Sequence, residues 1–232
     1  MEKIRFGNDL PELSYYETLD WHLNETRIVE FFPEKYYEVT LISVAEDNSI
    51  LIKYLNKIDS QLPIAIDLEW EDELCLFQFC LDTTVVIIRH PKGTANGFLF
   101  NFLKSHFFYG KGINHDLIKL YEKFNYDFKE NIEDIARTRL EPYGHSINFI
   151  QMTLQFAGKP TAEFKDVRIT KSNWDLPELS MRQVLYAAFD VVAIYQCYPN
   201  FPPSKILTKP QKQQKNHNQA KNQNKKKQKV SK

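Results

Sequence analysis

Hydrophobic and polar positions along the chain predict that regular structure begins with strands. Residues 36–44 (YYEVTLISV) alternate β-branched and aromatic side chains, which predicts a strand. Residues 49–58 place Ile50, Leu51 and Tyr54 near one face, which predicts an amphipathic helix. Strands are then predicted for three apolar runs, at residues 62–70, 74–80 and 84–89. Three consecutive strands this apolar indicate a sheet covered on both faces.

The later part of the pattern mixes helices with short strands. A helix is predicted after Ser180, because Ser180 and Gln183 form the capping-box pattern S-x-x-Q and Pro199 marks its end. The elements expected before it are, in order, a helix at 95–105, a short strand at 107–113, a helix at 115–124, a short strand at 131–135, and a helical stretch over 137–174 with loops near 142–144 and 158–160.

Strands first and mixed elements afterwards predict one α/β domain over residues 36–200. Residues 1–35 show no clear period and are interpreted as an N-terminal extension that packs on this domain. Residues 203–232 consist mostly of Lys, Gln and Asn, which cannot form a core, so we expect a disordered tail.

The formal net charge of zero conceals two oppositely charged parts. The tail holds ten Lys and no acid, which leaves 20 basic and 30 acidic residues, a charge of −10, on the first 202 residues. This asymmetry favours a folded body with a basic tail that attracts polyanions, so neutrality does not exclude a nucleic-acid partner. KKKQK at 225–229 is typical of a nuclear localisation signal, which favours a nuclear over a cytoplasmic location. Compositional drift remains an alternative explanation of the tail.

Other compositional features exclude several classes of protein. Three Cys residues (Cys75, Cys80 and Cys197) without a CxxC motif disfavour a disulfide framework and a zinc knuckle, and favour a reducing compartment. If residues 74–80 form one strand, Cys75 and Cys80 lie on opposite faces and pack in the core. The sequence contains no apolar signal segment, no membrane-length apolar run and no glycine-rich phosphate loop.

Acidic side chains recur at three places that suit metal binding or catalysis. Asp67 and Glu69 end an apolar strand and point to one face, where two carboxylates suit a hard cation such as Mg²⁺. Asp116 opens a predicted helix, and Asp190 lies four residues after Tyr186 on one helix face. Each has a simpler explanation when taken alone: a solvated strand end, a helix cap, and an exposed helical Asp.

Taken together, the three motifs resemble the DEDDy branch of the 3′–5′ exonuclease superfamily, which includes RNase D and the exonuclease domain of the Werner-syndrome helicase. The D-x-E motif is Asp67 and Glu69 in IAIDLEW, the second motif is Asp116 in GINHDLIKL, and Y-x-x-x-D is Tyr186 and Asp190 in LYAAFDVVAIY. The flanking segments DLEW, ELCLFQFC and SNW are also similar to the Werner-type group. The resemblance covers about residues 36–200.

The resemblance implies an RNase H-like fold, a central mixed sheet flanked by helices, and phosphodiester hydrolysis with two Mg²⁺ or Mn²⁺ ions. By the family pattern, Asp67 bridges both metals, Glu69 and Asp190 complete the site of the water-activating metal, and Asp116 holds the second. Tyr186 orients the nucleophilic water. The implied product is a nucleoside 5′-monophosphate from a free 3′ end of single-stranded or frayed DNA or RNA.

Further residues are weaker candidates for contacts with substrate. Trp70 can stack on a terminal base or pack beside the site, and His115 is interpreted as a substrate-side or surface residue. Lys165, Arg168 and Lys171 can contact phosphates or form a solvated face, and His145 is expected on a loop surface or at a helix start. The alternative function is a catalytically silent nucleic-acid-binding or adaptor protein that keeps the fold; a two-metal phosphatase for small phosphates ranks third.

Overall fold

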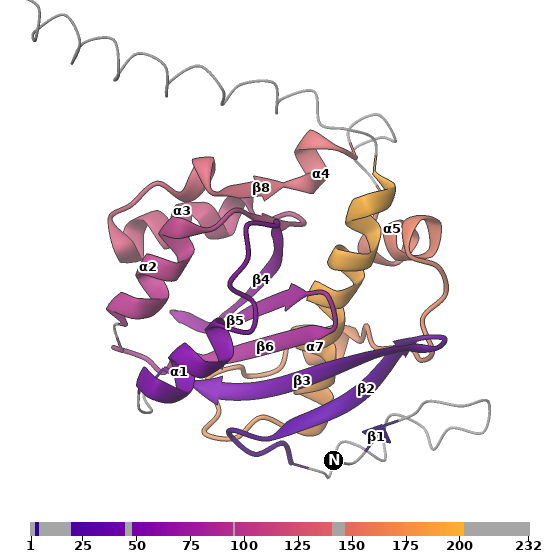
Figure 1. Cartoon of the computed structure of the whole chain (residues 1–232), viewed down its shortest axis with the longest axis horizontal. Helices are drawn as coiled ribbons and strands as arrows, with labels where there is room; N and C mark the ends of the chain where they lie inside the picture. The colour runs from indigo at the N-terminus through magenta and orange to yellow at the C-terminus, as the bar shows by residue number, and fades with distance from the viewer. Residues whose placement is uncertain (1–2, 5–19, 45–47, 95, 141–146, 202–232) are drawn as a thin grey trace, which may run out of the picture. The chain divides into compact units, whose positions relative to one another are not determined.

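The computed structural model describes residues 3–4, 20–44, 48–94, 96–140 and 147–201. In this part of the chain, eight strands form one sheet in the order β1-β2-β3-β6-β5-β4-β7-β8 (Figure 1). The strands are β1 (Lys3–Ile4), β2 (Thr26–Phe32), β3 (Lys35–Ser43), β4 (Ile64–Trp70), β5 (Leu74–Leu81), β6 (Thr84–Arg89), β7 (Phe108–Gly110) and β8 (Ile132–Asp134). The helices are α1 (Asn48–Leu55), α2 (Gly97–Ser105), α3 (Asn114–Phe124), α4 (Ile135–Thr138), α5 (Phe149–Phe156), α6 (Val167–Thr170) and α7 (Met181–Cys197), with short 3-10 turns η2 (Phe128–Glu130) and η4 (Tyr198–Asn200).

The sheet is mixed. Strand β5 pairs antiparallel with β4 and with β6, whereas β4 pairs parallel with β7 and β3 pairs parallel with β6. The central strands are buried along nearly their whole length, as their continuous apolar runs predicted. The predicted α/β class, a mixed sheet flanked by helices, is confirmed.

Two apolar cores lie on the two faces of this sheet. The α7-side core contains most of α7 together with Ala65 of β4 and Val85 of β6. The α3-side core contains apolar residues of α1, α2 and α3 together with Ile66 and Leu68 of β4. Figure 1 shows α7 crossing the central strands behind the sheet, with α1 and α2 toward the other side. Side chains that alternate along β4 therefore enter different cores.

Strand β5 contains an irregularity that the sequence pattern did not predict. Glu69 of β4 pairs with Leu76, but Trp70 pairs with Leu74, so Cys75 is an extra residue on β5. A bulge of this kind shifts the alternation of side chains. As a result Cys75 and Cys80 both join the α7-side core, and the expectation that they lie on opposite faces is wrong. Both thiols are buried, as expected of core residues.

Two other segments differ from, or add to, the sequence prediction. Residues 137–174 are less helical than expected, because α5 and the four-residue α6 are joined by segments without regular structure. Within the predicted N-terminal extension, β2 pairs with β3, and its Val29 and Phe31 are completely buried. The predicted tail, 203–232, lies outside the described residues. None of the described helices has the length and apolar character needed to cross a membrane.

Candidate active site

Strand β4 directs two carboxylates toward α7. Its Ile66 and Leu68 enter the α3-side core, and Ala65 enters the α7-side core. Because successive side chains of a strand point to opposite faces, Asp67 and Glu69 share the face of Ala65. The carboxylate of Asp67 accepts a hydrogen bond from the backbone N–H of Leu68 at 3.0 Å. The amide of Gln78 on β5 donates to Glu69 Oε1 at 3.4 Å.

Helix α7 brings Tyr186 and Asp190 to the same face of the sheet. The helix begins at a capping box, in which the Ser180 side chain accepts from the Gln183 N–H and the Gln183 side chain accepts from the Ser180 N–H. This confirms the start predicted from S-x-x-Q. Nearly every α7 residue is buried, including Tyr186 and Asp190, which are 3% and 2% exposed. A charged Asp so deeply buried requires a counter-charge or a metal.

Lys165 supplies a counter-charge for Asp190. Its ammonium forms an ion pair with Asp190 Oδ2 and donates a hydrogen bond to the Tyr186 hydroxyl at 2.7 Å. The Tyr186 hydroxyl also lies 2.8 Å from the hydroxyl of Thr170. The other carboxylate oxygen of the same side chain, Asp190 Oδ1, is buried without a hydrogen-bond partner.

The three carboxylates are close enough to perturb one another. Burial and the charge of Asp190 raise the pKa of Asp67, and burial together with the charges of Asp67 and Asp190 raises the pKa of Glu69. Burial also raises the pKa of Asp190, although Lys165 opposes it. Shifts in this direction are expected where carboxylates are gathered away from water, and such groups concentrate at functional sites.

Asp116 approaches the same cluster from a different element. It lies in the first turn of α3, is half-buried, and contributes to the raised pKa of Asp67. Burial raises the pKa of Asp116 itself to about 6, while Lys119 and Trp70 oppose the rise. Its position at the start of the helix also fits a favourable interaction with the helix dipole. Glu69, Asp116 and Asp190 thus each interact electrostatically with Asp67.

The donor chemistry of this cluster fits a hard divalent cation. Carboxylate oxygens are the ligands that Mg²⁺ and Mn²⁺ prefer. Asp190 Oδ1 is buried without a hydrogen-bond partner, and a bound cation would serve as its partner. The side chains are not, however, drawn together around one point. Among the described residues, no three His, Cys, Asp or Glu side chains converge closely enough to hold a metal ion. The carboxylates would have to move closer together to coordinate one.

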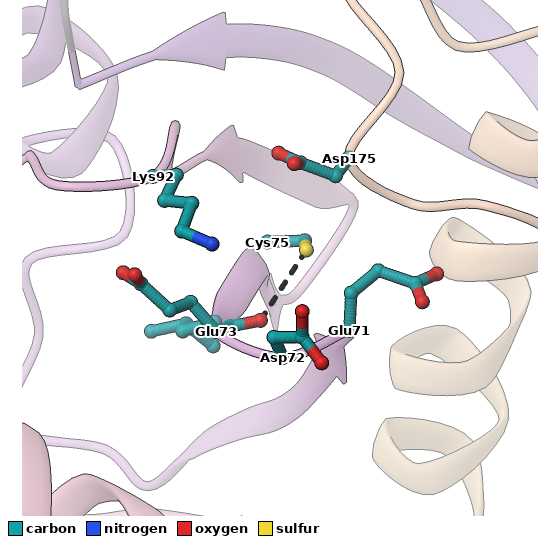
Figure 2. Close-up of a pocket in the computed structure, with 7 residues that line it drawn as sticks. Glu71, Asp72, Glu73, Cys75, Lys92 and Asp175 are labelled. Atoms are coloured by element: carbon teal, nitrogen blue, oxygen red, sulfur yellow. Dashed lines mark hydrogen bonds between the residues drawn. The ribbon is translucent and has the colours of Figure 1, made fainter.

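A small surface pocket lies immediately after β4. It is lined by Glu71, Asp72, Glu73, Leu74, Cys75, Lys92 and Asp175 (Figure 2). The Cys75 thiol donates to the backbone carbonyl of Glu73 at 3.4 Å, and Glu71 accepts from the backbone N–H of Trp174 at 2.9 Å. None of the predicted catalytic residues lines the pocket. This acidic pocket therefore follows β4 in the sequence and is separate from the cluster of Asp67, Glu69, Asp116 and Asp190.

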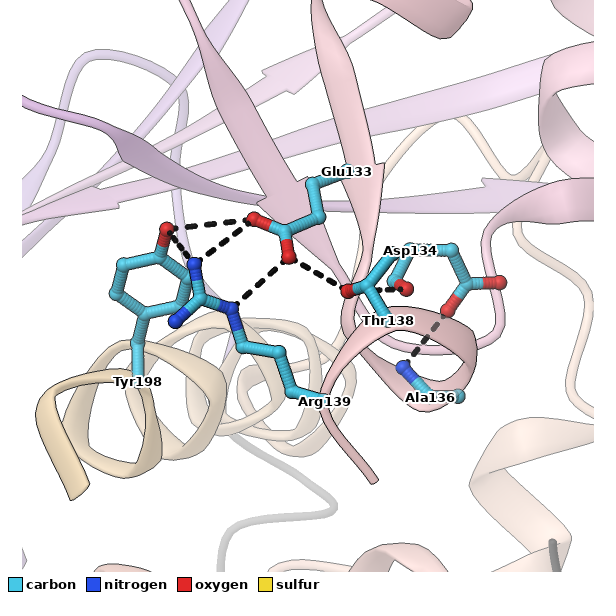
Figure 3. Close-up of polar contacts among 6 residues, drawn as sticks. All are labelled: Glu133, Asp134, Ala136, Thr138, Arg139 and Tyr198. Atoms are coloured by element: carbon cyan, nitrogen blue, oxygen red, sulfur yellow. Dashed lines mark hydrogen bonds and ion pairs between the residues drawn. The ribbon is translucent and has the colours of Figure 1, made fainter. Parts of the chain in front are cut away.

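A buried polar network fixes the far end of α7. Arg139, which follows α4, forms an ion pair at 2.9 Å with Glu133 of β8 and donates to the Tyr198 hydroxyl at 2.8 Å (Figure 3). The Tyr198 ring also stacks on Tyr109 of β7, with centroids 3.7 Å apart. Because Tyr198 directly follows α7, these contacts attach the helix to the β7–β8 edge of the sheet. They therefore help to set the position of Asp190 relative to β4.

The residues predicted to contact substrate occupy varied surroundings. His115 and Lys171 are exposed, and Arg168 is exposed with its guanidinium paired to Asp166 at 2.8 Å. Trp70 is half-buried, and the Lys119 ammonium lies 4.8 Å from the centre of its ring. No contact in the structure assigns these residues to substrate. His145 lies outside the described residues.

Two residues belong to the site although the motifs did not identify their roles. Gln78 is the one polar residue in LCLFQFC, and it pairs directly with Asp67 in the sheet. That polar interruption of an apolar strand is a signal that the sequence offers. Lys165 was predicted to face phosphates or solvent, and the structure places its ammonium on Asp190 and Tyr186 instead. No local pattern distinguishes it from the neighbouring Lys and Arg residues.

Buried carboxylates on a mixed sheet, facing a Tyr and an Asp of one helix, define a candidate acidic hydrolase site. Comparison with known proteins identifies the family. A family model described as 3′–5′ exonuclease matches residues 41–204. This chain therefore belongs to the 3′–5′ exonuclease family, and the resemblance drawn from the three motifs is confirmed. No curated protein sequence matches the chain.

Solved structures with the same fold are distant in sequence. Escherichia coli RNase D, an exoribonuclease involved in structured RNA processing, is 19% identical with a TM-score of 0.56, over 69% of this chain and 44% of its own. The Aedes aegypti Nibbler EXO domain is 17% identical with a TM-score of 0.54, over 78% and 89%. Brucella melitensis NrnC with bound Mg²⁺ is 20% identical with a TM-score of 0.50, over 62% and 74%. The chain thus spans less than half of RNase D, and these likenesses establish the RNase H-like fold.

Proposed function

We propose that the protein is a metal-dependent 3′–5′ exonuclease that removes nucleotides from the 3′ end of DNA or RNA and releases nucleoside 5′-monophosphates. The observation that carries the proposal is the electrostatic interaction of Asp67 and Glu69 on β4 with Asp190 on α7, one turn of the helix after Tyr186. Membership of the 3′–5′ exonuclease family supports it. The Mg²⁺ ion bound by NrnC supports a divalent cofactor.

Each carboxylate has a proposed part in holding two Mg²⁺ or Mn²⁺ ions. Asp67 would help to hold both ions, Glu69 and Asp190 would help to hold one of them, and Asp116 would help to hold the other. When bound, the ions supply charge stabilisation for the attacking and leaving oxygens of the phosphodiester. They also neutralise the carboxylate repulsion that raises the pKa values of Asp67 and Glu69. Without this neutralisation the site would repel a polyanionic substrate.

Tyr186 is proposed to orient the attacking water by hydrogen bonding. Burial and the charge of Asp190 raise the pKa of Tyr186 above its ordinary value. The hydroxyl therefore keeps its proton near neutral pH and can donate it in a hydrogen bond, which disfavours a role as a general base. Its position is fixed by contacts to Lys165 and Thr170.

The tail supports a nucleic-acid substrate through its charge alone. Its ten Lys would supply affinity for phosphates that does not depend on sequence, and would attract substrate to a body of charge −10. A nuclear location is part of the proposal and rests on the same segment.

The test is a degradation assay on labelled single- and double-stranded DNA and RNA, each with Mg²⁺ or Mn²⁺. We expect loss of nucleotides from the 3′ end, no activity with chelator, and at least a thousandfold loss in Asp67→Asn and Asp190→Ala. Glu122→Gln, a change at an exposed acid of α3, is the matched control and should remain active. Undiminished hydrolysis by either mutant would disprove the assignment. Binding without hydrolysis by the wild type would favour the alternative, a silent nucleic-acid adaptor.

A further inference from the structure

Lys165 is a cation placed within a cluster of carboxylates. Its side chain is 20% exposed, whereas that of its partner Asp190 is 3% exposed. The ammonium lies over two rings, with Nζ 4.1 Å from the ring centre of Tyr186 and 4.4 Å from that of Phe149. The Lys165 ammonium thus has two polar partners, the Asp190 carboxylate and the Tyr186 hydroxyl, in addition to the two rings.

Residues on both sides of Lys165 hold its backbone in place. The Phe164 ring stacks on Phe189 with centroids 4.8 Å apart and meets Phe31 edge-on at 5.0 Å. Asp166 caps α6 and forms an ion pair with Arg182 of α7. The backbone of Lys165 is thus fixed beside α7. Only its long side chain has freedom to change position.

The charge of Lys165 acts on the whole cluster and not on Asp190 alone. Its positive charge interacts favourably with Asp67 and Glu69 as well as with Asp190. By direct contact it occupies Asp190 Oδ2, while Oδ1 has no partner. Lys165 therefore compensates part of the negative charge of the cluster, and a divalent ion would compensate more of it.

We propose that Lys165 is a built-in counter-cation that competes with the divalent metal for Asp190. Its ammonium must release Asp190 Oδ2 when metal binds, while the Tyr186 hydroxyl and the rings of Tyr186 and Phe149 remain available to hold it. Lys165 thereby sets the metal concentration at which the site is filled. The inference rests on the proposed function, because it requires that the cluster binds a divalent metal.

The experiment measures metal binding directly. Full-length protein is freed of metal with chelator, dialysed and titrated with MnCl2 by calorimetry. Lys165→Met removes the charge and keeps the length of the side chain, and Lys165→Arg keeps the charge. The matched control is Lys111→Met. Lys111 is half-buried and influenced by the charges of Asp67 and Asp190, but within the described part of the chain it forms no ion pair with them.

We expect Lys165→Met to lower the Kd for Mn²⁺ at least tenfold, and Lys111→Met to lower it less than threefold. Lys165→Arg should bind no more tightly than the wild type. If metal-free Lys165→Met does not fold, Mn²⁺ should restore its circular dichroism spectrum, because the uncompensated carboxylates then depend on the metal.

Three results would overturn the inference alone, provided that the wild type binds Mn²⁺. These are an unchanged or higher Kd in Lys165→Met, a decrease no larger than that of Lys111→Met, and a Lys165→Met protein that stays unfolded with Mn²⁺. Absence of Mn²⁺ binding in the wild type would overturn the proposed function and the inference together.

Discussion

Gly110 lies at the end of β7, and the addition of a single methyl group there should disturb the site. It lies beside β4, and a Cβ atom added to it would be 2.7 Å from the carbonyl oxygen of Ile66 and 3.0 Å from Cδ1 of Ile113. Ile66 immediately precedes Asp67. Gly110→Ala would therefore push against the backbone that carries the first catalytic carboxylate. The first contact is with a backbone atom, which has no rotamer through which it can yield.

The expected magnitude follows from this geometry. Ordinary contacts of carbon atoms lie at about 3.5 Å, so β4 and β7 must separate by several tenths of an ångström. Overpacking of this kind costs about 1–3 kcal/mol, and a chain of this size loses roughly 2–4 °C of Tm for each kcal/mol. A displacement of about 1 Å at a catalytic group can cost about a hundredfold in rate, so we expect roughly a tenfold loss here.

The assay combines thermal unfolding with single-turnover degradation, and Gly97→Ala is the matched control. Gly97 begins α2, and a Cβ there would meet nothing within 4 Å. That change should leave activity unaltered and raise stability by up to about 1 kcal/mol. If Gly110→Ala matches Gly97→Ala in both Tm and rate, the close approach of β7 to β4 does not position Asp67, and the reasoning fails.

Three further predictions concern other parts of the protein. Burial and the charge of Lys123 lower the pKa of His90 to about 4, so as pH falls below about 6.5 the unfolded chain takes up a proton that the folded chain does not. His90 should therefore contribute about 2 kcal/mol less stability at pH 5 than at pH 7, whereas the carboxylates with raised pKa values contribute in the opposite direction, and the pH dependence of urea unfolding in His90→Gln should lack the His90 part. Tyr186→Phe should reduce single-turnover rates about a hundredfold with an unchanged calorimetric Kd for Mn²⁺; a large loss of metal affinity would indicate a structural role instead. Deleting residues 205–232 should weaken nucleic-acid binding and flatten its dependence on salt in anisotropy titrations, with chemistry near normal, and equal salt slopes would refute a binding role for the tail.

Much of the fold followed from the sequence because its elements are encoded locally. The apolar runs of β4, β5 and β6 and the capping box of α7 each carry their own signal, and all four were predicted. D-x-E and Y-x-x-x-D fix which side chains share a face, but the selection of Asp67, Glu69, Asp116, Tyr186 and Asp190 as a site came from the resemblance to DEDDy exonucleases.

What the sequence did not predict depends on contacts between distant segments. The bulge at Cys75 arises from the register of β5 against β4, which neither strand specifies alone. The place of Lys165 depends on the burial of Phe164 against β2 and α7, far apart in sequence. The strand β2 was missed because its burial depends on pairing with β3, so its residues alternate less clearly.

The position of α7 has a consequence for how this protein is made. Every strand of the described sheet precedes α7 in the sequence, yet α7 covers the central strands and supplies two of the five site residues. A chain emerging from the ribosome therefore holds Asp67 and Glu69 in place before Tyr186 and Asp190 exist to face them. Until residue 198 or so has been released, the nascent chain presents an uncovered apolar sheet that requires protection from aggregation. Under the proposed function, such an unfinished chain also lacks Tyr186 and Asp190 and would not hydrolyse nucleic acid.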